Sequence, residues 1–125
     1  MSNIILLLSM IFLHIVDDYY LQGVLAQMKQ KRWWIDNAPK ELYKHDYIMA
    51  LIEHAFSWTF MIHIPLFWVY HSNMNIYLFA ILFVSNWIIH AVVDNAKANK
   101  LIINLCQDQI IHIIQIIILW VCYVK

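Results

Sequence analysis

The chain has 125 residues, a formal net charge of zero at pH 7, 63% hydrophobic residues, 13% charged residues and a single glycine. A soluble domain of this size needs a polar surface that these residues cannot supply, whereas lipid accepts an exterior of Ile, Leu, Phe and Trp. The zero net charge removes any bulk electrostatic attraction to nucleic acid, so no nucleic-acid partner is expected. We therefore predict a single transmembrane domain over residues 1–125.

Four apolar runs are each long enough to cross a hydrocarbon core of about 30 Å, and the predicted spans cover residues 3–22, 46–70, 76–96 and 101–124. The first run lacks the basic start and the small-residue cleavage site of a removable signal peptide, so we expect it to stay as a span. Pro65 lies late in the second run and is expected to kink that helix without ending it. Because lipid forces backbone groups to bond within each segment, and barrel-type alternation is absent, we predict an all-α fold, an integral membrane four-helix bundle.

The segment between the first two spans, residues 23–45, is the one sizeable polar stretch, and its basic residues are Lys29, Lys31, Arg32, Lys40 and Lys44. Trp33 and Trp34 follow Arg32, a pattern typical of a short interfacial helix with its indoles at headgroup depth. The remaining tryptophan and tyrosine residues are expected in belts at the two membrane interfaces.

Lys97 and Lys100 mark the connection between the third and fourth spans. In a four-span protein this connection and the basic loop 23–45 lie on the same side of the membrane. The positive-inside rule then predicts a multi-pass protein of the bacterial inner membrane, with the basic loops in the cytoplasm and both termini outside.

Histidine and aspartate residues lie at matching depths in all four spans, at His14, Asp18, His54, His90, Asp94, Asp108 and His112. Three spans pair an imidazole with a carboxylate four residues away, a spacing that places both side chains on one helix face. Each pair can bind one metal jointly, or the carboxylate can orient the imidazole for the metal. Because ionisable side chains are costly in lipid, we expect a functional site beneath the cytoplasmic surface.

The alternative interpretation is that these residues only hold the helices together through hydrogen bonds. Such bonds contribute about 0.6 kcal/mol on average, a small gain for burying four carboxylates once Asp17 is included. A metal-binding or catalytic site is therefore favoured. His63 has no carboxylate at helical spacing and is expected to be a hydrogen-bonding core residue, whereas His45 and His71 are expected to be solvated.

Four blocks of the chain resemble, in order, the signature of a family of small bacterial and phage membrane proteins described as domain of unknown function 3307. The blocks are HIVDDYYLQ at residues 14–22 followed by Lys29, then His54, then HAVVDNAK at residues 90–97, and DQIIH at residues 108–112. The resemblance covers nearly the whole chain and implies a bacterial or phage source. The layout of this family is similar to that of membrane-bound metal-dependent hydrolases, which is a comparison by analogy alone.

Four imidazoles and three carboxylates exceed the four ligands of a closed zinc site, which favours two metals or one metal with an acid–base group. The expected ligands of one or two divalent ions, zinc by preference, are His14, Asp18, His54, His90, Asp94 and His112. Glu53 is the expected general base, Asp108 is expected to bridge or orient the ligands, and Lys97 is expected to neutralise a phosphate. These roles predict a metal-dependent hydrolase that acts on a lipid phosphate or phosphodiester at the cytoplasmic leaflet.

Two other functions stay open. A metal-ion or proton carrier or channel would need polar groups that continue to the opposite face, and only Ser57, Thr59 and His63 offer them in the second span. A non-catalytic phage or host membrane factor would instead bind partners through the loop that holds Trp33 and Trp34. A bundle of this size has little interior, which also favours a homo-oligomer.

Overall fold

The computed structural model describes residues 2–124, so Met1 and Lys125, the ends of the expected domain, lie outside the described residues. Within residues 2–124 the chain forms helices and loops and no strand, which confirms the all-α class. The long helices are α1 (Asn3–Val16), extended by a π-helical turn (Asp17–Leu21), α4 (Asp46–Tyr70), α5 (Ile76–Ala98) and α6 (Leu105–Tyr123).

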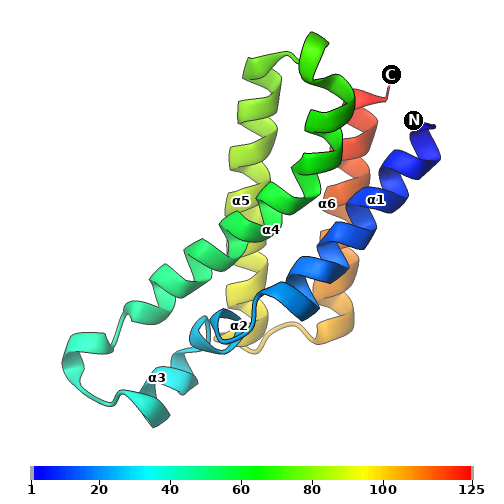
Figure 1. The fold of residues 1–125 in the computed structure, drawn as a ribbon. Helices are drawn as coiled ribbons and strands as arrows, with labels where there is room; N and C mark the ends of the chain where they lie inside the picture. The colour runs from blue at the N-terminus through cyan, green and yellow to red at the C-terminus, as the bar shows by residue number, and fades with distance from the viewer. Residues whose placement is uncertain (1, 125) are drawn as a thin grey trace.

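The four long helices pack around a common interior. Both α1 and α5 contact α4 on one side and α6 on the other. Figure 1 shows the two ends of the chain and the short turn His71–Asn73 at one end of the molecule. The α5–α6 connection and the segment between α1 and α4 lie at the opposite end, so the basic residues of both connections are on one side.

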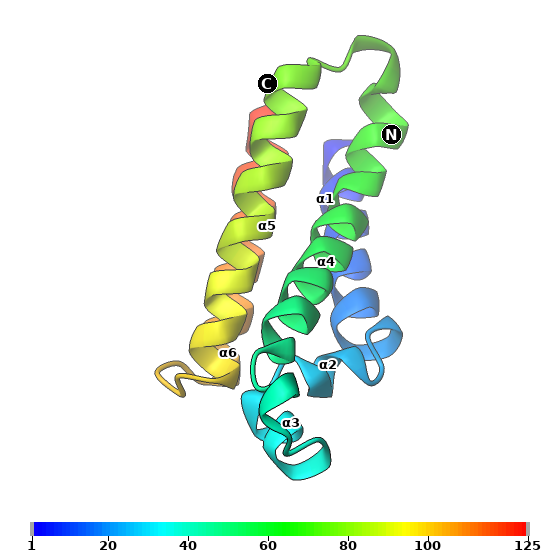
Figure 2. The ribbon, with the colours of Figure 1, turned by 90° about the vertical axis from the view of Figure 1, so that its left-hand side faces the viewer.

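The segment between α1 and α4 folds into two short helices, α2 (Leu25–Met28) and α3 (Lys31–Asn37), followed by a 3-10 turn (Glu41–Tyr43). The sequence predicted a single short interfacial helix here. Both short helices contact α4, and Figure 2 shows them below the ends of the long helices. The segment is also tied to the end of α5, because Asn99 accepts a hydrogen bond from the backbone N–H of Lys31 at 2.7 Å.

Capping side chains determine where α5 and α6 begin. The Asn75 side chain accepts hydrogen bonds from two backbone N–H groups of the first turn of α5. Asn104 and Gln107 form a reciprocal capping box at α6. This box makes Leu105 the first residue of α6, so the predicted start of the last span at residue 101 was four residues early. Asp108 consequently lies in the first turn of the helix.

In the described part of the chain, three helical stretches are long and apolar enough to cross a membrane, namely Asn3–Leu21, Ile76–Ala98 and Leu105–Tyr123. The helix α4 spans the predicted range and continues through Pro65, but it is not among the three. Its mean hydropathy is reduced by polar side chains, among them Glu53, His54 and His63. Large apolar side chains cover the outside of all four long helices, as a lipid environment requires.

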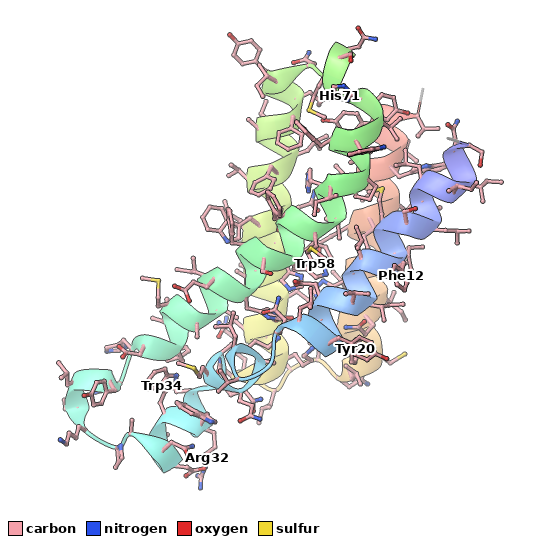
Figure 3. The ribbon with its side chains drawn as sticks, viewed as in Figure 1. Phe12, Tyr20, Arg32, Trp34, Trp58 and His71 are labelled. Atoms are coloured by element: carbon pink, nitrogen blue, oxygen red, sulfur yellow. The ribbon has the colours of Figure 1, made fainter. Side chains whose placement is uncertain are left out.

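The interior is divided into an apolar half and a polar half. Toward the chain ends the buried core consists of Leu6, Met10, Trp58, Ile62, Leu66, Ile116 and Leu119. Toward α2 and α3 the buried side chains are mainly imidazoles and carboxylates. Trp58 lies at the boundary, and Figure 3 shows it near mid-length of α4, whereas Phe12 on α1 and Tyr20 in the π-helical turn are exposed.

Candidate metal centre

Six side chains from all four long helices meet in the polar half, and we call them the histidine–aspartate cluster: Asp18, His54, His90, Asp94, Asp108 and His112. Asp94 lies at its centre and is fully buried. Its Oδ2 atom is 2.7 Å from Nε2 of His54, and its Oδ1 atom is 3.4 Å from Nε2 of His112. The structure therefore brings together residues that the sequence placed only at a common depth.

Two groups of three residues have the spacing of metal ligands. One consists of Asp18, His54 and His90, and the other of His90, Asp94 and His112. Within each group one donor atom from every residue lies within 4.8 Å of the others. Zinc bonds of about 2.0–2.2 Å require a modest further approach of these atoms, which side-chain rotation can supply. Because both groups include His90, they form one continuous set of donors.

The surroundings of His90 indicate a bound metal ion most directly. It is fully buried, and among the described residues neither of its ring nitrogens has a hydrogen-bond partner. Its faces are occupied instead by the rings of Trp58 and His112, whose centroids both lie 4.1 Å away. Buried polar atoms without a partner are costly, at about 1–3 kcal/mol each. A metal ion between the donors would supply the missing partner.

The π-helical turn at the end of α1 explains how two consecutive carboxylates both reach the interior. The sequence predicted a regular helix here, in which Asp17 and Asp18 would point about 100° apart. Asp17 instead accepts hydrogen bonds from the Ser57 hydroxyl at 2.8 Å and from the Gln22 amide. Asp18 lies with an oxygen 3.5 Å from Nε2 of His54. Single π turns of this type occur frequently at functional sites.

His14, an expected ligand, lies beside the cluster and belongs to neither group of donors. Its Nδ1 atom accepts a hydrogen bond from the indole N–H of Trp58 at 2.6 Å. The proton is therefore on Nε2, which lies 3.1 Å from Oε1 of Gln109 and donates to it. With both nitrogens engaged, His14 supports the cluster without a free donor atom. The expectation of an interfacial position was wrong for Trp58, which is fully buried.

Two lysine side chains enter the polar half, and the sequence anticipated only one of them. Lys97 pairs with Asp108 and lies 3.9 Å from Oδ1 of Asp94. Lys29 was placed in the polar loop, but only 7% of it is exposed. Its ammonium donates to Asp94 and lies 2.8 Å from Nε2 of His54. The position of Lys29 just after the first-span motif was the one signal that could have identified it.

In the neutral form that metal ligands take, the imidazoles of the cluster leave its carboxylates in excess over its cations. With neutral imidazoles, its three carboxylates face only two ammonium groups, and Asp17 adds another carboxylate nearby. Buried charges of one sign are costly unless they are paired. A divalent ion would neutralise the excess negative charge.

The sequence assigned catalytic roles to Asp108 and Glu53, and the structure places only Asp108 in the cluster. Asp108 has an oxygen 3.4 Å from Nε2 of His112, the nitrogen that also faces Asp94, so it lies beside the donors and can bridge to them. Glu53 lies on the exposed surface of α4, although the neighbouring residue His54 is buried. Adjacent helical residues point about 100° apart, and Glu53 is therefore directed away from the cluster. This position does not suit a general base for chemistry at the cluster.

The fold and the site define a class of protein: all-helical, with three helices apolar enough to cross a membrane and a buried histidine–aspartate cluster. Comparison with family models, with curated proteins and with solved structures finds no match. The resemblance to domain of unknown function 3307 stays a prediction. The chemistry of the cluster must therefore be inferred from its own donor atoms.

Proposed function

We propose that this chain is an integral membrane protein that binds a divalent metal, zinc by preference, and uses it to hydrolyse a lipid phosphate or phosphodiester. The proposed ligands are Asp18, His54, His90, Asp94 and His112. The observation that carries the proposal is the position of His90, which is shared by both donor groups while both of its buried nitrogens lack a partner within residues 2–124.

The donor set favours zinc over magnesium and calcium. Imidazoles suit zinc and other transition metals, whereas magnesium and calcium prefer sites made of oxygen atoms. Catalytic zinc sites use three protein ligands and keep one position open. Five donor residues are more than such a site needs, so those that do not bind the metal can hold or move protons. When bound, the metal supplies an activated water for hydrolysis.

The residues around the donors support phosphate chemistry. Oε1 of Gln115 lies 3.1 Å from Nδ1 of His112 and keeps that imidazole oriented, with Nε2 directed toward Asp94 and Asp108. Lys97 is the most accessible charged group beside the donors, with 23% of its side chain exposed. Its ammonium can leave Asp108 and pair with an incoming phosphate oxygen. Asp94, between three imidazoles, can accept a proton or hold one in place.

The proposed position in the membrane agrees with a lipid substrate. All four long helices would cross the membrane, with the basic connections in the cytoplasm by the positive-inside rule. The cluster lies in the half of the interior nearest those connections, close to the depth of the phosphate groups of the cytoplasmic leaflet. The reacting partner would be a membrane lipid.

A second candidate function, transport of protons or metal ions, is favoured by a short chain of buried polar side chains. Nδ1 of His112 lies 3.1 Å from Oε1 of Gln115, and the Gln115 amide donates to Asn86 at 3.2 Å. Beyond these residues the buried polar side chains include Thr59 and His63 on α4, but the neighbouring buried side chains are apolar, among them Leu66 and Leu119. A pathway for ions would have to cross this apolar core, so hydrolysis is the better supported proposal.

The proposal is tested first by measuring metal content and then by measuring lipid hydrolysis. Protein purified in detergent should contain zinc by elemental analysis, and His90→Ala and Asp94→Ala should reduce the content to background. Zinc-loaded protein should release phosphate or headgroup from vesicles that contain phosphatidic acid and phosphatidylglycerol, and chelation should stop the release. Unchanged metal in both variants would refute the ligand assignment. Full metal loading without any hydrolysis, combined with ion flux in liposomes, would favour the transport function.

A further inference from the structure

Lys29 places a positive charge between the two donor groups. Its ammonium contacts His54, which belongs to the first group, and Asp94, which belongs to the second. The side chain reaches this position from the segment after α2, outside the long helices. Only 7% of Lys29 is exposed. The ammonium of Lys29 therefore lies against one donor residue of each group.

The ammonium of Lys29 and a metal ion exclude each other for two reasons. Nε2 of His54 lies 2.8 Å from the ammonium nitrogen, so a metal bound to this ring nitrogen would need the position that the ammonium occupies. A divalent ion at the donors would also lie within a few ångström of the ammonium, and two like charges repel strongly in a buried site. Metal binding thus requires Lys29 to leave.

We infer that Lys29 is a specificity-determining residue, a tethered cation that only a strongly bound metal displaces. The inference rests on the proposed metal site and concerns the selection of its ion. Magnesium and calcium gain little from imidazole ligands and cannot replace the ammonium. Zinc gains enough from His54 and the other imidazoles to do so. In the absence of zinc, Lys29 neutralises part of the negative charge of the cluster.

The surroundings of Lys29 show how this exchange can occur without unfolding the segment. The backbone carbonyl of Lys29 accepts a hydrogen bond from the Asn99 amide at 3.0 Å, and Asn99 also accepts the N–H of Lys31. These bonds hold the backbone against the end of α5. Displacement therefore needs only rotation of the long lysine side chain, whose charged end can then reach the headgroup region.

Metal affinity is the first test. Zinc should be titrated into the metal-free protein against a competing chelator, for the wild type and for Lys29→Met, Lys29→Arg and Lys31→Met. Hydrogen bonds to charged groups contribute about 1.5–3 kcal/mol, so Lys29→Met should bind zinc roughly ten to a hundred times more tightly than the wild type. Lys29→Arg keeps a cation and should show no such gain. Lys31, which is exposed, provides the matched control.

Chemical modification of the wild-type protein is the second test and needs no variant. An amine-acetylating reagent should leave Lys29 unmodified in metal-free protein and modify it after zinc is added, as measured by mass spectrometry of its peptide. Magnesium at the same concentration should leave Lys29 protected. Lys31 should react under all three conditions.

The outcomes separate this inference from the proposed function. If neither the wild type nor Lys29→Met binds zinc, the proposed metal site is wrong and the inference falls with it. If both bind zinc with equal affinity, or if Lys29 stays protected in zinc-loaded protein, the site stands and the role of Lys29 is refuted. Tighter binding by Lys29→Met together with zinc-dependent modification of Lys29 would support the inference.

Discussion

The indole of Trp58 lies flat against the imidazole of His90, with ring centroids 4.1 Å apart and ring planes inclined by 18°. The same indole belongs to the apolar core that fills the other half of the interior. Trp58 thus separates the histidine–aspartate cluster from the apolar core. On the opposite side the cluster is bounded by Lys29 and Lys97.

The hydrogen bond from Trp58 to His14 should contribute to stability more than to metal binding. Trp58→Phe keeps an aromatic ring against His90 but removes the N–H and leaves Nδ1 of His14 unpaired. We expect the free energy of unfolding to fall by about 1–3 kcal/mol, measured by denaturant titration in detergent, while zinc affinity changes little. Trp68→Phe is the control, because Trp68 is 80% exposed. A large loss of zinc binding in Trp58→Phe would show that the indole has a more direct part in the site.

Replacement of His90 should affect the stability of the metal-free protein and that of the zinc-bound protein in different ways. His90→Phe keeps the stacked ring and removes two buried polar atoms that have no partner. The metal-free variant should therefore be as stable as the wild type, or more stable by about 1 kcal/mol. Zinc should raise the melting temperature of the wild type and leave that of His90→Phe unchanged. If the metal-free variant is strongly destabilised, the nitrogens of His90 have partners in the protein and the reason for a metal at this position disappears.

Asp94 should be essential both for metal binding and for stability. Asp94→Asn preserves the shape of the side chain but removes the charge that pairs with Lys29 and contacts three imidazoles. Zinc affinity should fall by more than about a hundredfold, as expected for loss of a ligand rather than a supporting residue. The free energy of unfolding should also fall, but by less than the cost of about 3–5 kcal/mol expected for a trapped buried charge, because the Lys29 side chain can rotate out of the cluster. Asp36→Asn, in an exposed ion pair with Arg32, should change neither quantity.

Glu53 and Lys97 should differ in a hydrolysis assay. Because Glu53 is exposed and points away from the cluster, Glu53→Gln should retain the zinc content and the hydrolysis rate of the wild type. Lys97→Met should retain zinc but lose at least about tenfold in kcat, because the phosphate charge is no longer neutralised. A loss of activity in Glu53→Gln with full metal content would restore the glutamate as the general base.

Periodicity and spacing in the sequence were sufficient to predict the long helices and the convergence of the cluster. Apolar length defines the helices, and alternation of direction places His54, His90 and His112 at one depth. The i to i+4 pairing of His90 with Asp94 is a property of one helix, so it is readable without any tertiary contact.

Which residues surround the cluster could be learned only from the tertiary contacts. The π-helical turn that turns Asp17 inward follows from packing against α4, because hydrogen bonds to Ser57 and Gln22 hold the carboxylate there. Trp58 carries no sequence signal that distinguishes a buried indole from one at the membrane interface. Glu53 and His54 are neighbours in sequence, and only the orientation of α4 decides which of them is buried.

By itself, the sequence determined that the chain is helical, apolar enough for lipid, and equipped with imidazoles and carboxylates on facing helices. The tertiary structure alone decided that Lys29 folds back from a polar loop to lie between His54 and Asp94. The physical reason is that periodicity describes one helix at a time. The partner of a buried charge, in contrast, can come from any segment whose side chains reach it. A long flexible side chain such as that of Lys29 can reach it from outside the helices.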